Sequence, residues 1–267
     1  MNGFPLHPGK HALPAVPDPA EHAAYVRTTD PEADLAPFDG VLLYQGRLLE
    51  HALRTYRTSP RPGWVRGGLH LVEDQGRRFA LCGGFGLGAP AAALVVEQLA
   101  ALGTRQIVTV GTAASLQQGL SAGTLVVPTS ALRDEGLSHH YLPPGRTASP
   151  SAVLTQHLTE ALASYDLPVT RGPIWTTDAP YRETTAEVTR YGAEGILAAD
   201  MEAAAVFAVG RCRTVAVATV LAIADSLVDR RPRQHSPDTE HALHTALAAA
   251  AQALHTSTAS PPPLGEH

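Results

Sequence analysis

Cysteines, aromatic residues and long apolar runs are all scarce in this chain. Its 267 residues include two cysteines, Cys82 and Cys212, which lack the spacing of a metal site or of a C-x-x-C redox pair. Both lie in apolar stretches, so we expect them to be buried, reduced thiols. No apolar run approaches the ~18 residues that a membrane-spanning helix needs, and the N-terminal segment lacks the apolar core of a signal peptide. We therefore expect a cytoplasmic protein without a membrane partner.

A surplus of positive charge is missing as well. The formal net charge is −5 and the pI is about 6.2. The basic residues are scattered, apart from Arg230, Arg231 and Arg233, so no nucleic-acid partner is expected. With 44% hydrophobic residues, a chain of this length can bury a large core. We expect one large α/β domain.

Strand-like and helix-like segments alternate along most of the chain. Predicted strands cover residues 40–44, 67–84 (a hairpin that turns at 74–76), 106–112, 123–134, 169–177, 195–199 and 214–225. Predicted helices cover residues 46–56, 90–102, 150–166, 183–191, 202–210 and 238–251. This alternation, with near-continuous apolar strands, predicts a mainly parallel sheet with helices on both faces. Residues 1–40 are interpreted as an irregular leader, 41–255 as the α/β domain and 256–267 as a disordered tail.

The glycine-rich stretch ALCGGFGLGAPAAALVVEQL, residues 80–99, is compatible with two functions. Gly84, Gly86 and Ala89 fit the G-x-G-x-x-G/A pattern of a dinucleotide-binding turn. A nicotinamide-binding unit also needs an acidic residue at the end of the next strand, and residues 106–115 contain none. We therefore interpret the turn as one that brings backbone N–H groups, and the helix start at Ala89, close to an anion other than a dinucleotide.

Four motifs in a fixed order give the sequence a family resemblance. They read GFGLGAP, VGTAASLQQGLSAGTLVVPTSALRDEGLSHHYLP, TTDAPYRE and DMEAAAVF, within residues 81–227. The chain resembles the nucleoside phosphorylase family, which includes uridine phosphorylases, hexameric purine nucleoside phosphorylases and methylthioadenosine nucleosidases. The resemblance implies a doubly wound, partly closed mixed sheet and a homo-oligomer, either a dimer or a trimer of dimers. It also implies cleavage of the bond between ribose C1′ and a base, with a nucleoside and phosphate as substrates and without a cofactor or metal.

Ribose recognition is the role that the resemblance assigns to Met201 and Glu202. Glu202 is implied to accept hydrogen bonds from the 2′- and 3′-hydroxyl groups, and Met201 to pack on the ribose face. A carboxylate here also favours a sugar that gains positive charge in the transition state. The alternative is an acid that satisfies free N–H groups at a helix start. Thr112, in the VGT motif, is a further candidate for the ribose site.

Asp225, at the end of the last predicted strand, is the candidate for assisting the departure of the base. In the purine-specific branches of the family an acid at this place donates to N7, and the pyrimidine branch lacks it. Such a carboxyl group must be protonated or strongly hydrogen-bonded, and burial at a strand end can raise its pKa. The alternative is an Asp that stabilises the turn after the strand.

The phosphate site departs from the family pattern. Relatives carry an early Gly-Asp-Pro turn followed by an arginine, where this chain has only Gly46 and Arg47. They also carry an arginine two residues before the Gly-Thr of the third strand, where this chain has Thr109. A phosphate dianion needs strong donors once water is excluded, so other groups must replace these arginines or water must be the acceptor. The candidates for phosphate binding are Gly86, Gly88, Thr112, Arg66 and Arg47, with Arg133 and Arg182 as further arginines.

The base pocket is implied to lie at TTDAPYRET, residues 176–184. Relatives place a phenylalanine where this chain has Pro180, so Tyr181 or Trp175 is the candidate for a flat stacking surface. Arg182 is a candidate for binding a pyrimidine carbonyl. The alternative is an exposed arginine that pairs with Glu183.

Three expectations concern loops and subunit contacts. Asp178 is expected to cap a turn. His139 and His140 lack a third ligand at metal spacing, so we expect them in loop packing or at a subunit interface rather than in a zinc site. Arg66 falls near the position of an arginine that some relatives donate across the dimer.

These observations favour a nucleoside phosphorylase that releases a free base and ribose 1-phosphate. The first alternative is a nucleosidase that uses water, with Glu202, Asp134, His139 or His140 as the general base. The second is a non-catalytic nucleoside-binding protein. The choice between purine and pyrimidine stays open, because Asp225 favours purines and the stretch RDEGLSHHYLP favours the uridine phosphorylase branch.

Overall fold

One mixed sheet organises the chain. The computed structural model describes residues 6–33, 35, 39–74, 77–229 and 235–257. Its strands lie in the order β10-β6-β8-β9-β5-β1-β4-β3-β2, and β7 pairs with β6. The strands are β1 (Asp39–Leu43), β2 (Thr58–Pro60), β3 (Gly68–Asp74), β4 (Arg77–Gly83), β5 (Gln106–Ser115), β6 (Leu125–Asp134), β7 (Thr147–Ala148), β8 (Val169–Thr177), β9 (Ala198–Asp200) and β10 (Ala216–Ser226). β1 runs parallel to both β4 and β5, whereas β3 and β4 form the predicted antiparallel hairpin.

β10 closes part of this sheet into a ring. It pairs in parallel with β5 and antiparallel with β6, and β8 and β9 complete the circuit from β6 back to β5. The register between β10 and β5 shifts between Ile223 and Asp225, so that Ala224 is one extra residue in β10. A bulge of this kind bends a strand and redirects the side chains that follow it. The ring confirms the expected partly closed mixed sheet.

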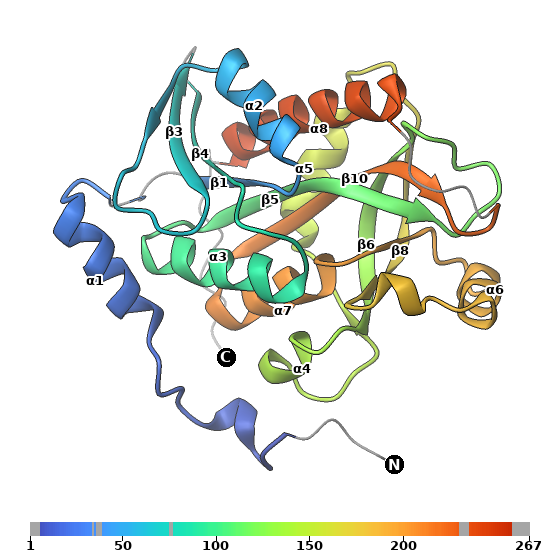
Figure 1. The fold of residues 1–267 in the computed structure, drawn as a ribbon, viewed down its shortest axis with the longest axis horizontal. Coiled ribbons are helices and arrows are strands. Elements are labelled where there is room, and N and C mark those ends of the chain that lie inside the picture. The colour runs from blue at the N-terminus through green and yellow to red at the C-terminus, as the bar shows by residue number, and fades with distance from the viewer. Residues whose placement is uncertain (1–5, 34, 36–38, 75–76, 230–234, 258–267) are drawn as a thin grey trace.

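Helices cover both faces of the sheet, as Figure 1 shows. The helices are α1 (Pro19–Thr29), α2 (Gly46–Thr55), α3 (Ala89–Ala101), α4 (Ser138–Tyr141), α5 (Ala152–Leu162), α6 (Thr185–Ala193), α7 (Ala203–Arg213) and α8 (Pro237–Ser257), with two short 3₁₀ helices, η1 (Lys10–Ala12) and η2 (Pro180–Arg182). α3 and α7 lie on one face, and α2 and α8 lie on the other. The glycine-rich turn leads into α3, and the DMEA motif leads into α7, so both arrive on the same face.

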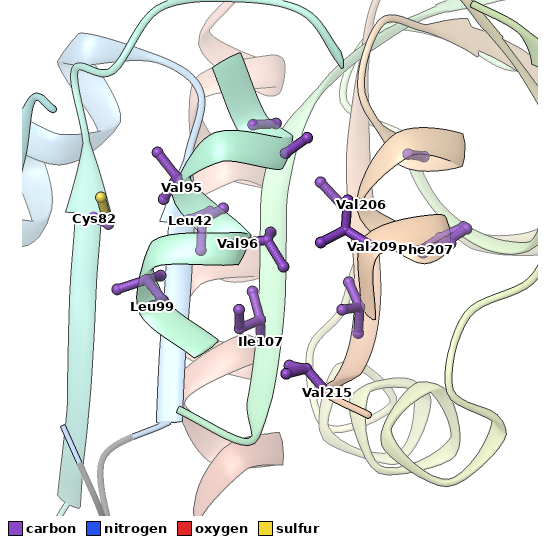
Figure 2. Close-up of a cluster of buried hydrophobic side chains, with 14 of the residues drawn as sticks. Leu42, Cys82, Val95, Val96, Leu99, Ile107, Val206, Phe207, Val209 and Val215 are labelled. Carbon is purple, nitrogen blue, oxygen red and sulfur yellow. The ribbon is translucent and has the colours of Figure 1, made fainter. Parts of the chain in front are cut away.

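Branched aliphatic side chains join α3 and α7 to the sheet. Figure 2 shows this core, which includes Leu42, Cys82, Val95, Val96, Leu99, Ile107, Val206, Phe207, Val209 and Val215. α7 lies very close to β10 at Gly210. A Cβ atom added there would be only 2.5 Å from Cγ2 of Val217 on β10. The resulting dense packing fixes the N-terminus of α7 relative to the strand ends.

The leader contains a helix that the sequence analysis did not predict. α1 begins after Asp18, whose side chain accepts a hydrogen bond from the N–H of Ala20, and it has Pro19 in its first turn. It buries only Ala23 and Val26, so its apolar face is too sparse to give a clear helical period. The interpretation of residues 1–40 as irregular is therefore wrong for this part of the leader.

Two further expectations need correction or restriction. Cys82 is buried as expected, but Cys212 is exposed, because it lies in the last turn of α7 where the helix reaches the surface. At the C-terminus, α8 extends to Ser257, beyond the predicted end of the domain. The rest of the predicted tail, residues 258–267, lies outside the described residues.

Candidate active site

The glycine turn and the start of α7 meet at Glu202. One carboxylate oxygen of Glu202, Oε1, accepts a hydrogen bond of 2.7 Å from the N–H of Gly88, and the residue is 4% exposed. Gly88 has φ 90° and ψ 170°, a backbone conformation that residues other than glycine rarely adopt. Met201 lies beside this turn, since a Cβ at Gly88 would be 3.9 Å from its Cε atom. Two predicted parts of the site, far apart in sequence, are thus joined.

Asp200 is the residue that caps α7. Its carboxylate accepts hydrogen bonds from the N–H groups of Glu202 and Ala203, at 3.2 and 2.7 Å, and from the hydroxyl of Thr176 at 2.6 Å. The Thr176 hydroxyl in turn accepts a hydrogen bond from the N–H of Ala204. The side chain of Glu202 makes no capping hydrogen bond. The alternative role considered for Glu202 therefore belongs to Asp200, which the sequence analysis missed although Asp is a favoured residue at a helix start.

Burial and a neighbouring charge control the ionisation of Glu202. Burial and the Asp200 carboxylate raise its pKa above the ordinary value, while the N–H groups of Gly88 and Met201 act in the opposite direction. Within the described residues, no ion pair stabilises this carboxylate. A sugar that becomes positively charged in the transition state would supply a cation, so the site can favour the transition state over the bound nucleoside.

The ends of β1 and β5 form the next part of the site. The Gln45 amide donates a 3.1 Å hydrogen bond from Nε2 to the hydroxyl of Thr112, and the Gln45 Oε1 atom is buried without a described partner. The ring of Tyr44 packs against Gly111, where a Cβ would come within 2.6 Å of it. It meets Phe85 edge-to-face, with ring centroids 5.9 Å apart. The sequence analysis missed Tyr44 and Gln45, which follow β1 where the family resemblance implied a Gly-Asp-Pro turn.

The glycine turn leaves several donors free for an anion. The N–H groups of Gly86, Leu87 and Ala89 have no acceptor among the residues that the structure describes. Gly86 has φ 108°, and α3 begins at Ala89, so the turn presents successive N–H groups at the positive end of a helix. This arrangement can bind an anion without an arginine.

Arg47 lies beside the candidate site, whereas Arg66 does not contact it within one chain as described. Arg47 lines a cavity of about 380 Å³ between α2 and α8, together with Gln45, Glu240 and His244. Because Gln45 contacts Thr112, this cavity adjoins the ends of β1 and β5. Arg66 is exposed on the loop before β3, and no contact among the described residues joins it to Glu202. Its expected role across a dimer stays a prediction.

Thr109 and Arg133 have structural partners. The Thr109 hydroxyl is buried and lies 2.8 Å from the hydroxyl of Thr219, at the position where the family resemblance implied an arginine. The Arg133 guanidinium donates to the Ser138 hydroxyl and to the carbonyls of Leu142, Pro143 and Gly145. Its donors are thus occupied in holding the loop after α4, and Arg133 does not replace the missing phosphate ligands.

The base end of the site differs from the prediction in two respects. Trp175 is 1% exposed, and its Nε1 donates a 2.9 Å hydrogen bond to Asp134, so it is part of the core and offers no stacking surface. Tyr181 on η2 is fully exposed within one chain. Arg182 is exposed, as the alternative of a surface arginine required. No ion pair with Glu183 is formed among the described residues. The charge of Arg182 instead lowers the pKa of Glu187.

Asp225 and Glu183 line one cavity of about 740 Å³ beside α6. Asp225 follows the β10 bulge, and Glu183 lies between η2 and the N-cap of α6. Burial, the charge of Asp225 and the charge of Glu187 raise the pKa of Glu183 to about 7. The sequence analysis treated Glu183 only as a partner for Arg182, because no local motif indicates that β10 ends opposite it.

The loop residues have structural contacts. Asp178 accepts a 2.8 Å hydrogen bond from the N–H of Gly136, which joins the segment after β8 to the segment after β6 rather than capping the turn of Asp178 itself. His139 packs beside Arg133, and its carbonyl lies 3.0 Å from Nε2 of His11 in the leader.

Within the described ranges, no group of three or more His, Cys, Asp or Glu side chains is placed to hold a metal ion. None of the helices in these ranges combines the length and apolar character of a membrane span.

Comparisons with known proteins agree with this geometry. A family model described as Phosphorylase superfamily matches residues 64–259. Guanosine phosphorylase from Halorubrum lacusprofundi is 32% identical over 155 residues, which are 58% of this chain and 64% of that protein. Uridine phosphorylase from Treponema pallidum is 32% identical over 178 residues, 61% of this chain and 69% of that protein. The chain thus matches slightly less than two thirds of the first relative's length.

A solved structure supports the same assignment. The crystal structure of uridine phosphorylase from Vibrio fischeri ES114 superimposes with a TM-score of 0.72 at 25% identity, and the match covers 83% of this chain and 92% of that one. The family match includes the glycine turn, Thr112, the DMEA motif and Asp225. On the joint evidence of sequence, fold and site, this chain belongs to the phosphorylase superfamily.

Proposed function

We propose that the chain is a nucleoside phosphorylase, which converts a nucleoside and phosphate into a free base and ribose 1-phosphate. The observation that carries this proposal is the contact between Glu202 and the N–H of Gly88. It holds a buried carboxylate next to Met201, where a ribose can lie between the glycine turn and α7. The names of the relatives, guanosine and uridine phosphorylases, support the same reaction.

The residues divide the reaction into three tasks. Glu202 accepts hydrogen bonds from the ribose hydroxyls and stabilises positive charge on the sugar as the bond to the base breaks. The free N–H groups at Gly86 and Ala89, with the hydroxyl of Thr112, hold phosphate on the other side of C1′. Asp225 donates a proton to the departing base, which receives the electron pair of the broken bond. We propose that no cofactor or metal takes part.

The assembly and location remain part of the proposal. We propose that the enzyme works in the cytoplasm as a homo-oligomer, with Arg66 of one chain reaching the site of a neighbour. The side chain of Leu87, in the glycine turn, is exposed. It is a suitable apolar contact for the neighbouring chain. Light scattering on the purified chain measures the expected oligomer.

Product analysis tests the proposed reaction. Uridine, thymidine, inosine, adenosine and methylthioadenosine are each incubated with the enzyme, with and without phosphate, and the base and sugar products are separated by chromatography. We expect base release that depends on phosphate, with one ribose 1-phosphate formed for each base. Base and free ribose in the absence of phosphate would identify a hydrolase instead, and binding without turnover would identify a nucleoside-binding protein.

Thr112 provides a separate prediction about phosphate. Replacing it with valine removes the hydroxyl that faces Gln45 and that we assign to phosphate. We expect the KM for phosphate to rise by a factor of about 10 or more, as for the loss of one hydrogen bond to a charged group. Initial rates at several phosphate concentrations measure this change, and Thr159→Val on α5 is the control. An unchanged KM would remove Thr112 from the phosphate site.

A further inference from the structure

The side chain of Gln45 uses only one of its two polar groups. Its Nε2 group donates a 3.1 Å hydrogen bond to the hydroxyl of Thr112, whereas its Oε1 atom is buried and accepts no hydrogen bond from the described residues. Buried polar atoms in native proteins nearly always have a partner, because an unsatisfied one costs free energy. An amide oxygen can only accept a hydrogen bond, so the partner that Oε1 lacks must carry a donor.

The backbone around Gln45 fixes the position of this side chain. Gln45 is the N-cap residue of α2, with φ −103° and ψ 129°, and its carbonyl accepts hydrogen bonds from the N–H groups of Leu48 and Leu49. Its side chain makes no capping hydrogen bond. The amide group therefore reaches across to Thr112 on β5 instead of folding back onto its own helix, which leaves Oε1 to a ligand at the ends of β1 and β5.

The groups around Gln45 favour an anion as this ligand. Thr112 accepts the hydrogen bond from Gln45 and so keeps its own hydroxyl proton for another acceptor. Arg47 lies in the first turn of α2, at the positive end of the helix, and lines the same cavity of about 380 Å³ as Gln45. Glu240 is the acid among the described lining residues, and it lies 3.4 Å from His235. An anion here meets several donors and one acceptor.

A single acceptor among donors distinguishes one anion from another. Hydrogen phosphate has three bare oxygens, which accept hydrogen bonds, and one P–OH group, which donates one. Sulfate has the same charge and tetrahedral shape near neutral pH, but it carries no proton. Hydrogen phosphate can thus satisfy Oε1 of Gln45, whereas sulfate would place a negative oxygen against it. An arginine has donors only and would not make this distinction.

We propose that Gln45 makes the acceptor site selective for a protonated oxyanion. Its Oε1 atom accepts the P–OH hydrogen of phosphate, while Thr112 donates to a bare oxygen. The inference rests on the proposed function, in which Thr112 holds phosphate, and deepens it. The contact turns the P–OH group away from the sugar. A bare oxygen then bonds to C1′, the base leaves with the electron pair of the broken bond and the proton assigned to Asp225, and the P–OH hydrogen stays on ribose 1-phosphate.

Anion binding to the purified chain tests the proposal without a nucleoside. Isothermal titration calorimetry at about pH 8 and constant ionic strength gives the Kd values of phosphate, arsenate and sulfate. Arsenate keeps one O–H group near this pH, as phosphate does, so it is the second protonated anion. We expect the wild type to bind phosphate and arsenate at least about 10-fold more tightly than sulfate, as for one hydrogen bond to a charged group.

Gln45→Met removes the acceptor and keeps a side chain of similar length. We expect it to weaken the binding of phosphate and arsenate about 10-fold or more and to leave that of sulfate within about twofold. If Gln45 only held Thr112 in place, the variant would weaken all three anions alike. The ratio of the phosphate and sulfate Kd values therefore separates the two roles. Gln156→Met, on the exposed side of α5, is the matched control and should bind all three as the wild type does.

Three results would overturn the inference: equal affinity of the wild type for phosphate and sulfate, absence of phosphate binding, or an unchanged ratio in Gln45→Met. The side chain of Gln45 does not cap α2, so the variant keeps the contacts of the helix start, and sulfate binding reports an intact site. If Gln45→Met loses the selectivity but the wild type cleaves no nucleoside, the proposed function fails and the role of Gln45 in anion binding stands. If phosphate-dependent cleavage occurs and the ratio is unchanged, the inference fails alone.

Discussion

Replacing Glu202 with glutamine should lower kcat/KM for nucleoside cleavage by a factor of about 10² to 10³, the size expected for loss of one preorganised electrostatic contact. The amide oxygen can still accept the hydrogen bond from Gly88, so the turn and α7 remain joined. What disappears is the negative charge that stabilises the positive sugar, together with one of the two acceptors for the ribose hydroxyls. Steady-state kinetics with the best substrate of the product analysis measure the loss.

The same variant should not be less stable than the wild type at pH 8. The pKa of Glu202 is raised in the folded protein, so the folded state holds this proton more strongly than the unfolded chain does. The stability that the residue contributes is therefore present at low pH and is lost as the pH rises from the unfolded pKa to the folded one. Glutamine cannot ionise and escapes this loss. Thermal unfolding at pH 5 and pH 8 measures the difference, with Glu160→Gln on the exposed side of α5 as the control.

Activity close to the wild-type value in Glu202→Gln would contradict the assigned role. A large drop in melting temperature would instead show that the carboxylate is needed for folding, and the kinetic result would then say little about catalysis. Because the two measurements respond differently to the charge and to the hydrogen bond, they distinguish these cases.

Phe207→Ala should produce the largest loss of stability that we predict. Phe207 is 2% exposed in the core between α7 and the sheet, where Figure 2 shows it on the same helix as Val206 and Val209. Removing a buried aromatic ring costs about 3–5 kcal/mol, because apolar contacts are lost and a cavity remains. In a chain of this size that corresponds to a fall in melting temperature of about 10 °C or more.

Denaturant or thermal unfolding of Phe207→Ala measures this cost, and Arg211→Ala, on the exposed side of the same helix, is the control. We expect the control to change the unfolding free energy by less than about 0.5 kcal/mol. We also expect a higher KM for the nucleoside in Phe207→Ala, since α7 carries Glu202 at its N-terminus. A loss below about 1 kcal/mol would mean that the surrounding helices close the cavity and that α7 is held in place by other contacts.

The parts of the site that could be predicted are those written in contiguous motifs. The glycine turn and DMEA each carry their chemistry within a few residues, so Gly88, Met201 and Glu202 were found before the structure brought them together. The strand pattern also predicted the central sheet, because buried strands are continuous apolar runs. The short leader helix α1 was missed because it buries too few side chains to show a helical period.

The residues that could not be predicted depend on contacts between distant segments. Asp200 and Glu202 are both acidic, and only the hydrogen bonds show that Asp200 caps α7 while Glu202 faces the glycine turn. Trp175 was predicted as a base-stacking surface because an aromatic residue near the base motif suggests stacking. Both faces of this end of β8 are buried, and the ring of Trp175 lies in a core cluster with Leu116 and Leu132. The cavity that Glu183 and Asp225 line together also depends on where the ring closure places the end of β10.

The extra residue at Ala224 in β10 has a consequence for how this site can change in evolution. Successive side chains along a strand point to opposite sides of the sheet. The side that a residue faces therefore depends on whether it is an odd or an even number of residues from a fixed point on the strand. Ala224 changes that parity just before Asp225. Deleting one residue would turn the acid to the other side of the sheet, and no substitution can do the same. Gain or loss of the acid at this place therefore depends on a change in length as much as on a change of residue.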